Sequence, residues 1–135
     1  KDIHKHIDDS PNWNDNPKKS YIIDIDGTIC SLELYKTKEG KIDNDETLAK
    51  PFYGRISHFN KLYDEGHTII YMTARGMGRH KNNQLLAIQD FYMFTMEQII
   101  NWGCKFHHLF LGKPAADHYI DDKGINDEDF FNTGN

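Results

Sequence analysis

Residues 21–28, YIIDIDGT, lead from an isoleucine-rich apolar run directly into two carboxylates, a glycine and a threonine. A short β-branched run that stops at a polar cluster is typical of a buried strand. Residues two apart in a strand point to the same side, so Asp24 and Asp26 can reach one small volume. Two close anions favour a bound cation, and hard oxygen ligands suit Mg²⁺. Gly27 allows a sharp turn and Thr28 adds a hydroxyl; the alternative is an ordinary solvated loop.

The composition limits the kind of protein this chain can be. Its 135 residues suit one domain. We expect residues 1–19 to form a flexible N-terminal tail or linker and residues 20–135 to form a single domain. The net charge of −5, with both signs interspersed, argues against a nucleic-acid groove and a membrane surface. No apolar run approaches the roughly 20 residues of a membrane span, and two cysteines favour a reducing compartment. We therefore expect a cytoplasmic protein, and leave a disulfide open.

Strands and helices alternate along the predicted domain. Residues 68–72, 108–111 and 118–120 are further short apolar runs, and a helical pattern occupies residues 52–65. A strand, a helix and a strand in this order predict a right-handed crossover and a parallel pair. The expected fold class is therefore α/β, with a mainly parallel central sheet.

Three connecting segments are expected to have structure of their own. Residues 29–51 are too long for an ordinary connection and predict a small hairpin or flap over the site, with an exposed loop as the alternative. Thr95 can cap a helix that ends at Gly103, after a weak helical pattern in residues 76–94. Residues 125–131 predict a closing turn or short helix against the core.

Every predicted strand ends in polar residues. In an open parallel sheet, ligands bind outside the carboxyl ends of the strands, so these residues should converge. They are Asp24, Asp26, Thr73, Lys113, Asp121 and Asp122. We interpret them as a phosphoryl-transfer site, because that reaction depends mostly on positioning and charge neutralisation.

Each residue of this group has a predicted role. Asp24 is the nucleophile, because an ionised carboxylate can accept a phosphoryl group as an acyl phosphate. Asp26 protonates the leaving oxygen and later deprotonates the attacking water. Lys113 and Mg²⁺ offset the repulsion between Asp24 and the phosphate. The Thr73 hydroxyl and the Ala74 amide bind the phosphate.

Further candidates hold the metal and the rest of the substrate. At least one of Asp121 and Asp122 is expected to ligate Mg²⁺ beside Asp24 and Asp26, and the other can act through water. The turns after the first two strands supply candidates for phosphate and substrate binding: Gly27, Thr28, Ala74, Arg75, Arg79, His80 and Lys81. For the last four, a solvated basic loop is the alternative.

The order of these motifs resembles that of the haloacid dehalogenase-like (HAD) phosphohydrolase superfamily, over about residues 20–131. The matching residues are Asp24-Ile25-Asp26-Gly27-Thr28, Thr73, Lys113 and Asp121-Asp122. Finer details are similar to the small phosphatases of capsular polysaccharide biosynthesis: Ile29-Cys30, Thr73-Ala74-Arg75, Gly112-Lys113-Pro114 and Tyr119-Ile120-Asp121-Asp122. In that subgroup asparagine is frequent where this chain has Gly27.

The resemblance implies a Rossmann-like three-layer core, Mg²⁺ and an aspartyl-phosphate intermediate. Many members carry a cap domain, but the intervals 28–52 and 73–113 leave no room for a large one. An open site, completed by the flap or by another subunit, is therefore expected, and a homo-oligomer is left open.

The resulting hypothesis is a Mg²⁺-dependent phosphatase that hydrolyses a small phosphorylated metabolite, expected to be a sugar phosphate. A nucleotide or polynucleotide-end phosphatase on the same fold is the first alternative, although the weak basic character argues against nucleic acid. A non-catalytic, receiver-like phosphate-binding module is the second. In receiver domains, however, the adjacent acidic pair belongs to the first strand and the acceptor to a later one, the reverse of the order here.

Overall fold

The computed structural model describes residues 17–132, so residues 1–16 of the expected tail lie outside the described part. The central sheet has three parallel strands in the order β1-β4-β5. They are β1 (Ser20–Asp24), β4 (Thr68–Thr73) and β5 (His108–Leu111). The predicted parallel pairing of the first two strands is confirmed, with Asp24 opposite Met72 in the register. All three strands therefore end at the same edge of the sheet.

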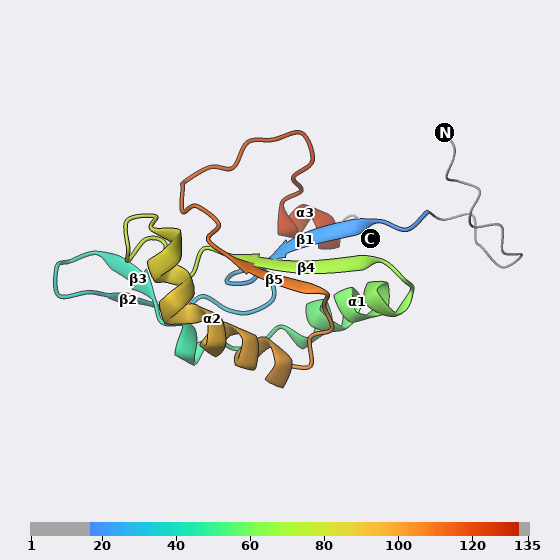
Figure 1. Cartoon of the computed structure of the whole chain (residues 1–135), viewed down its shortest axis with the longest axis horizontal. Coiled ribbons are helices and arrows are strands. Elements are labelled where there is room, and N and C mark those ends of the chain that lie inside the picture. The colour runs from blue at the N-terminus through green and yellow to red at the C-terminus, as the bar shows by residue number, and fades with distance from the viewer. Residues whose placement is uncertain (1–16, 133–135) are drawn as a thin grey trace, which may run out of the picture.

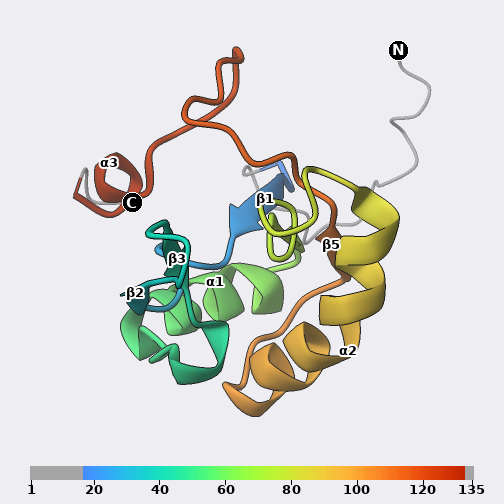
Figure 2. The ribbon, with the colours of Figure 1, turned by 90° about the vertical axis from the view of Figure 1, so that its left-hand side faces the viewer.

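Helices cover the sheet as in a Rossmann-like fold. Helix α1 (Tyr53–Asp64) connects β1 to β4, and helix α2 (Gln84–Asn101) connects β4 to β5. Both lie on one side of the sheet. The C-terminal segment passes along the other side and leads to α3 (Asp127–Asn132), which lies beside the β1 edge against α1 (Figures 1 and 2). The predicted α/β class with a Rossmann-like three-layer arrangement is thus confirmed. Within residues 17–132, no helix combines the length and the apolar character that crossing a membrane requires.

The core lies between the sheet and the two long helices. Side chains alternate along β4, so Ile69, Tyr71 and Thr73 are buried on the helix-covered face. The opposite face is open at both outer strands, where Ile22 is 68% exposed and Phe110 is 49% exposed. The helix-covered face therefore provides most of the hydrophobic stabilisation.

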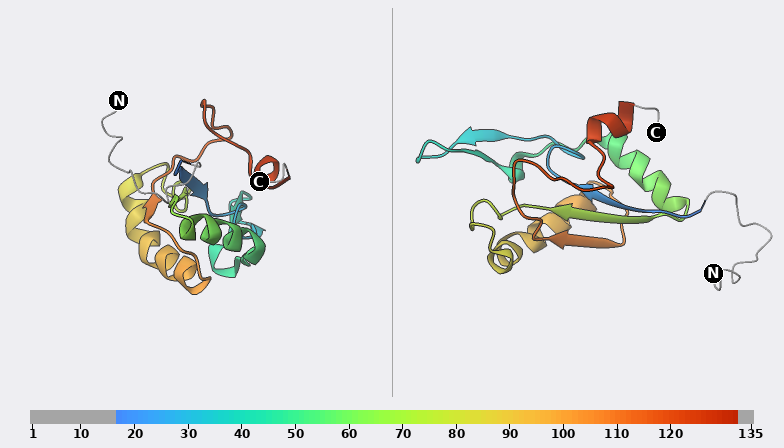
Figure 3. Two further views of the ribbon diagram at one scale, coloured as in Figure 1. Left: turned by 90° about the vertical axis from the view of Figure 1, so that its right-hand side faces the viewer. Right: turned by 90° about the horizontal axis from the view of Figure 1, so that it is seen from above.

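The long connection after β1 forms the predicted hairpin. Strands β2 (Leu34–Lys36) and β3 (Ile42–Asn44) pair antiparallel, and a single 3₁₀ turn, η2 (Glu46–Leu48), follows. The hairpin projects beyond the carboxyl ends of the sheet strands (Figure 3). It is the only insertion between β1 and α1, so the described chain carries no large cap domain at that position.

The predicted helix start at Thr95 is wrong. One continuous helix runs from Gln84 to Asn101, and its N-cap is Asn83, whose side chain accepts a hydrogen bond from the Leu86 amide at 3.1 Å. No glycine or proline interrupts this stretch, so nothing forces a break. The predicted end is confirmed, because Gly103 follows the last turn with a φ of 85°.

The predicted fourth strand at residues 118–120 is also wrong. Residues 112–126 contain neither helix nor strand, and the Ile120 side chain is 93% exposed. Local hydrogen bonds hold this loop: the Tyr119 hydroxyl donates to the Pro114 carbonyl at 2.6 Å, and the Lys123 amide donates to Asp121 at 2.8 Å. A stretch of three residues with only Tyr119 and Ile120 as large apolar side chains buries too little surface to impose strand pairing on such a loop.

The predicted C-terminal turn is the short helix α3. Phe130 stacks on Phe59 of α1, with ring centroids 5.8 Å apart. Arg55 of α1 donates to Asp127 at 2.7 Å and to the Thr28 carbonyl at 3.1 Å, and its guanidinium lies 4.5 Å from the centre of the Phe131 ring. These contacts tie α3 to α1 and to the turn after β1.

Candidate active site

The turn after β1 places the first two carboxylates. Gly27 adopts a φ of 87°, a left-handed conformation that favours glycine. The Thr28 amide donates to the Ile25 carbonyl at 3.0 Å, and the Gly27 amide donates to the Cys30 carbonyl at 2.9 Å. These bonds close a tight turn at the carboxyl end of β1. The backbone that carries Asp24 and Asp26 is therefore held by the sheet before these residues and by the turn after them.

Asp24 is half-buried and has two polar partners. Lys113 Nζ donates to its Oδ1 at 3.4 Å, and the Thr28 hydroxyl donates to its Oδ2 at 3.3 Å. Burial raises the pKa of Asp24, the Lys113 charge opposes that rise, and the Asp26 charge adds to it. The carboxylate thus sits in an environment where added positive charge is favourable.

Lys113 and Thr73 reach the same place from the neighbouring strands. The amide of Lys113, two residues after β5, donates to the carbonyl of Thr73, the last residue of β4, at 3.2 Å. The Lys113 ammonium also lies 4.4 Å from the centre of the Tyr119 ring. The Thr73 hydroxyl accepts from the Arg75 amide at 3.1 Å. The predicted convergence of Asp24, Thr73 and Lys113 is therefore present.

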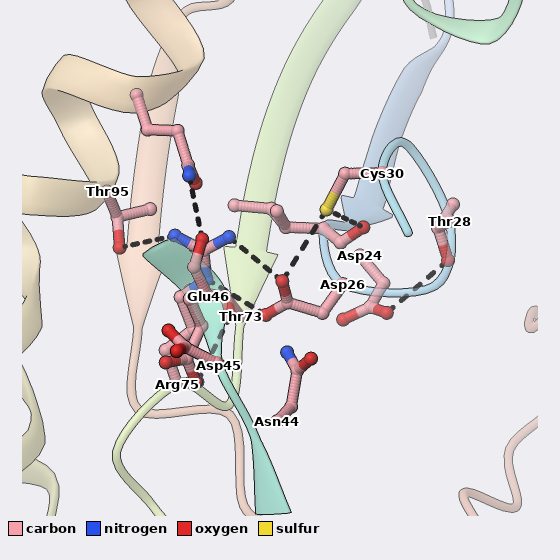
Figure 4. Close-up of polar contacts among 12 residues, drawn as sticks. Asp24, Asp26, Thr28, Cys30, Asn44, Asp45, Glu46, Thr73, Arg75 and Thr95 are labelled. Carbon is pink, nitrogen blue, oxygen red and sulfur yellow. Dashed lines mark hydrogen bonds and ion pairs between the residues drawn. The ribbon is translucent and has the colours of Figure 1, made fainter. Parts of the chain in front are cut away.

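Asp26 is held by Arg75 (Figure 4). The guanidinium donates from Nε and Nη2 to the two Asp26 oxygens, each at 2.9 Å, and from Nη1 to the Thr95 hydroxyl at 3.2 Å. Burial alone would lower the pKa of Arg75, but the hydrogen bonds and charge of Asp26 raise it. Substrate binding by Arg75 stays a prediction: Arg75 lines the cavity, but its side chain is 0% exposed and three of its nitrogens already donate to Asp26 and Thr95.

A cavity of about 600 Å³ opens beside these residues. Its walls come from the strand ends, from the hairpin and from the loop after β4. Arg79, which the sequence suggests as a candidate for substrate binding, lines this wall and donates to Asp43 of the hairpin at 3.3 Å. Ala74 also lines the cavity. His80 instead contacts Asp90 of α2 at 2.6 Å.

Sequence reasoning missed two residues near Asp26. Glu46 of η2 is 8% exposed and lines the cavity, and burial raises its pKa. The Gln98 side chain donates to the Glu46 carbonyl at 2.9 Å and so fixes η2 against α2. Thr95 is fully buried in the middle of α2. A glutamate in a polar loop and a threonine in a helix give no signal of these positions.

The predicted metal ligands are only partly brought together. Asp121 and Asp122 lie in the exposed loop after β5, outside the residues that line the cavity. Among residues 17–132, no group of three His, Cys, Asp or Glu side chains gathers closely enough to hold an ion. Hydrogen bonds from the Lys123 and Gly124 amides instead occupy Asp121 and lower its pKa. Within residues 17–132, Asp24 and Asp26 are the two predicted ligands that line the cavity.

Comparison with known proteins supports the fold. A crystal structure of a target protein from Vibrio cholerae is similar, with a TM-score of 0.68 over 83% of this chain and 86% of that one. The two sequences are 23% identical over the match. No protein-family model and no curated protein sequence matches the chain. Fold and topology together define it as a Rossmann-like α/β protein.

Proposed function

We propose that this chain is a phosphatase of the HAD type that hydrolyses a small phosphomonoester, such as a sugar phosphate, through an aspartyl-phosphate on Asp24. One observation carries the proposal: Lys113 Nζ lies 3.4 Å from Asp24 Oδ1, in a cavity that Thr73 also lines. A carboxylate nucleophile, a cation and a hydroxyl are what phosphoryl transfer to an aspartate requires. The order of the sequence motifs supports the same assignment.

The proposed reaction has two steps. First, an Asp24 oxygen attacks phosphorus, the bond to the leaving oxygen breaks, and that oxygen takes a proton from Asp26. Water then attacks the phosphorus of the aspartyl-phosphate and gives a proton to Asp26, while the bond to Asp24 breaks and releases inorganic phosphate. Lys113 and Thr73 stabilise the charge on the phosphoryl oxygens in both steps.

Mg²⁺ is part of the proposal as the expected cofactor. When bound, it would neutralise charge on the phosphate. The raised pKa of Asp24 supports a need for positive charge at this place, because the Asp26 charge contributes to that rise. Only Asp24 and Asp26 of the predicted ligands lie at the cavity, so no step is assigned to the metal. A cytoplasmic location is also proposed, supported by two free, buried thiols.

The cavity walls favour a polyhydroxylated substrate over a nucleotide. Thr37, Asp43 and Asn44 of the hairpin offer hydrogen-bonding groups that suit hydroxyls. Tyr119 is the only aromatic ring among the described lining residues, and the Lys113 ammonium already lies over it. The nucleobase of a nucleotide substrate would therefore find no second aromatic side chain, among the described lining residues, between which to stack.

The test is a phosphate-release screen with Mg²⁺ over sugar phosphates, nucleotides and 3′-phosphorylated oligonucleotides. We expect wild type to release phosphate and the near-isosteric Asp24→Asn variant to release none. Asp64→Asn is the matched control, because Asp64 pairs with Lys105 on the exposed surface, outside the cavity. Near wild-type turnover by Asp24→Asn would refute the nucleophile. No release from any probe by the folded wild type would refute the phosphatase.

A further inference from the structure

Arg75 is an unusually buried cation. Its side chain is 0% exposed, and three of its nitrogens donate to oxygen atoms of Asp26 and Thr95 at distances between 2.9 and 3.2 Å. Removing a guanidinium from water is costly, and apolar packing usually stabilises a core at least as well. This cluster therefore calls for an explanation beyond stability.

Thr95 is equally unexpected where it lies. It is 0% exposed on the buried face of α2, between the apolar core positions Ala87 and Ile99. Its hydroxyl accepts from Arg75 Nη1 and so fixes the rotation of the guanidinium. The remaining edge of the guanidinium then meets both Asp26 oxygens at once (Figure 4). A bidentate fork defines the plane of a carboxylate more tightly than one hydrogen bond does.

We propose that Arg75 and Thr95 are positioning residues that hold Asp26 as the proton acceptor in the second step of the reaction. This inference rests on the proposed function. A carboxylate that accepts hydrogen bonds at both oxygens from one guanidinium is held in one plane and one place, which suits a proton transfer from the attacking water. In the second step, water attacks phosphorus, its proton passes to Asp26, and the bond between phosphorus and the Asp24 oxygen breaks. Arg75 and Thr95 act through Asp26 and do not touch the phosphoryl group.

The role predicts which step suffers when the cluster is disturbed. Thr95→Val keeps the side-chain shape and removes the hydroxyl, so Arg75 loses the partner that orients it. The second step should slow more than the first, and the aspartyl-phosphate should accumulate. A purely structural role would reduce turnover without changing how the enzyme divides between its free and phosphorylated forms.

The experiment uses p-nitrophenyl phosphate that carries radioactive phosphorus. Turnover is measured in the steady state, and the fraction of labelled protein is measured after acid quenching. For Thr95→Val we expect kcat to fall about tenfold, a part of what a general base contributes, while the labelled fraction rises above that of wild type. Thr95→Ser should restore both values. Ile99→Val is the control, because it loosens the packing of the same helix without touching Arg75.

Three results would overturn the positioning role: an unchanged kcat in Thr95→Val, a lower kcat without a rise in the labelled fraction, or the same rise in Ile99→Val. A wild-type protein that takes up no label and releases no phosphate would instead reject the proposed function, and the positioning role with it. The two failures are therefore distinguishable.

Discussion

The chain has two acidic pairs at similar positions in its sequence pattern, yet the backbone treats them differently. Asp24 is the last residue of β1 and Asp26 follows that strand, which pairs along its whole length with β4. Asp121 and Asp122 follow residues 118–120, which pair with nothing in the sheet and lie in an exposed loop. The direction of the first pair of side chains is therefore set by strand pairing in the sheet, and we call Asp24 and Asp26 the sheet-aimed pair. The direction of the second pair, the loop pair, is set only by local turns. Strand pairing, more than the identity of the acids, places a carboxylate in this fold.

After Asp24→Asn, the largest effect of a substitution should follow from changing Asp26, the other carboxylate of the pair at the end of β1. Asp26→Asn keeps the shape of the side chain but cannot exchange the proton, so kcat should fall by about 10²- to 10⁴-fold. The measurement is phosphate release together with a thermal unfolding curve. Asp122→Asn is the matched change in the loop pair and should cost less activity. Equal losses in the two variants would remove the distinction between the pairs.

Substitutions of Lys113 test how much positive charge at the carboxyl edge of the sheet is needed for phosphoryl transfer. It is the cation nearest to Asp24 in the described chain, at 3.4 Å. Lys113→Ala should lower kcat by about 10²-fold, because it removes one fixed stabiliser of the phosphoryl charge. Lys113→Arg should recover part of the loss. If the alanine variant changes only KM, Lys113 binds substrate and does not stabilise the transition state.

These contrasts explain how far the sequence could predict the site. Asp24, Thr73 and Lys113 were predictable because each lies at the carboxyl end of a strand that pairs in the sheet, and parallel strands share one carboxyl edge. Arg75 was recognised as a candidate site residue, but its ion pair with Asp26 was not predicted, since nothing in the local sequence shows that the side chain turns inward.

Thr95 was misread for a related reason. A threonine at the start of a helical pattern signals a cap, but this hydroxyl bonds a side chain 20 positions away. The prediction for Asp121 and Asp122 failed for a different reason. Residues 118–120 have the sequence pattern of a strand, and the pattern alone does not reveal whether a strand has a pairing partner. Local rules therefore found the strand ends, and tertiary contacts decided the rest.

Metal dependence tests whether the loop pair joins the site during catalysis. If Mg²⁺ is required and Asp121 ligates it, verified metal removal should abolish activity, and Asp121→Asn should raise the Mg²⁺ concentration needed for half-maximal rate about tenfold or more. Hydrogen exchange in residues 112–126 should slow when Mg²⁺ is added. Full activity in excess EDTA would exclude the metal. Unchanged Mg²⁺ dependence in Asp121→Asn would leave the loop pair without a catalytic part.

The free energy of unfolding gives a second comparison, between the contacts of Arg55 beside β1 and the exposed loop at residues 112–126. Arg55 bridges α1, α3 and the turn after β1, so Arg55→Ala should lower the free energy of unfolding by about 2 kcal/mol. Ile120→Ser replaces a side chain that is already exposed and should change it by less than about 0.5 kcal/mol. Urea unfolding measures both. A large loss in Ile120→Ser would show that residues 118–120 are buried in solution and would restore the fourth strand.

The smallest effect concerns Glu46, a buried carboxyl group in η2, after the hairpin, that lines the same cavity as Asp24 and Asp26. Burial raises the pKa of Glu46, the Asp26 charge adds to the rise, and Arg75 and Arg79 oppose it. A carboxyl with a raised pKa stabilises the fold while it is neutral, and this contribution is lost as the pH rises through its folded-state pKa. Glu46→Gln should therefore increase the free energy of unfolding at pH 7 by up to about 1 kcal/mol.

The pH dependence of that difference gives the decisive measurement. Below the usual pKa range of glutamate, both proteins have a neutral side chain at this position, so their urea unfolding curves should coincide. The difference should open as the pH rises towards neutrality. A Glu46→Gln protein that is less stable than wild type at pH 7 would reverse the sign, because it would mean that Arg75 and Arg79 stabilise the ionised carboxylate more than burial penalises it.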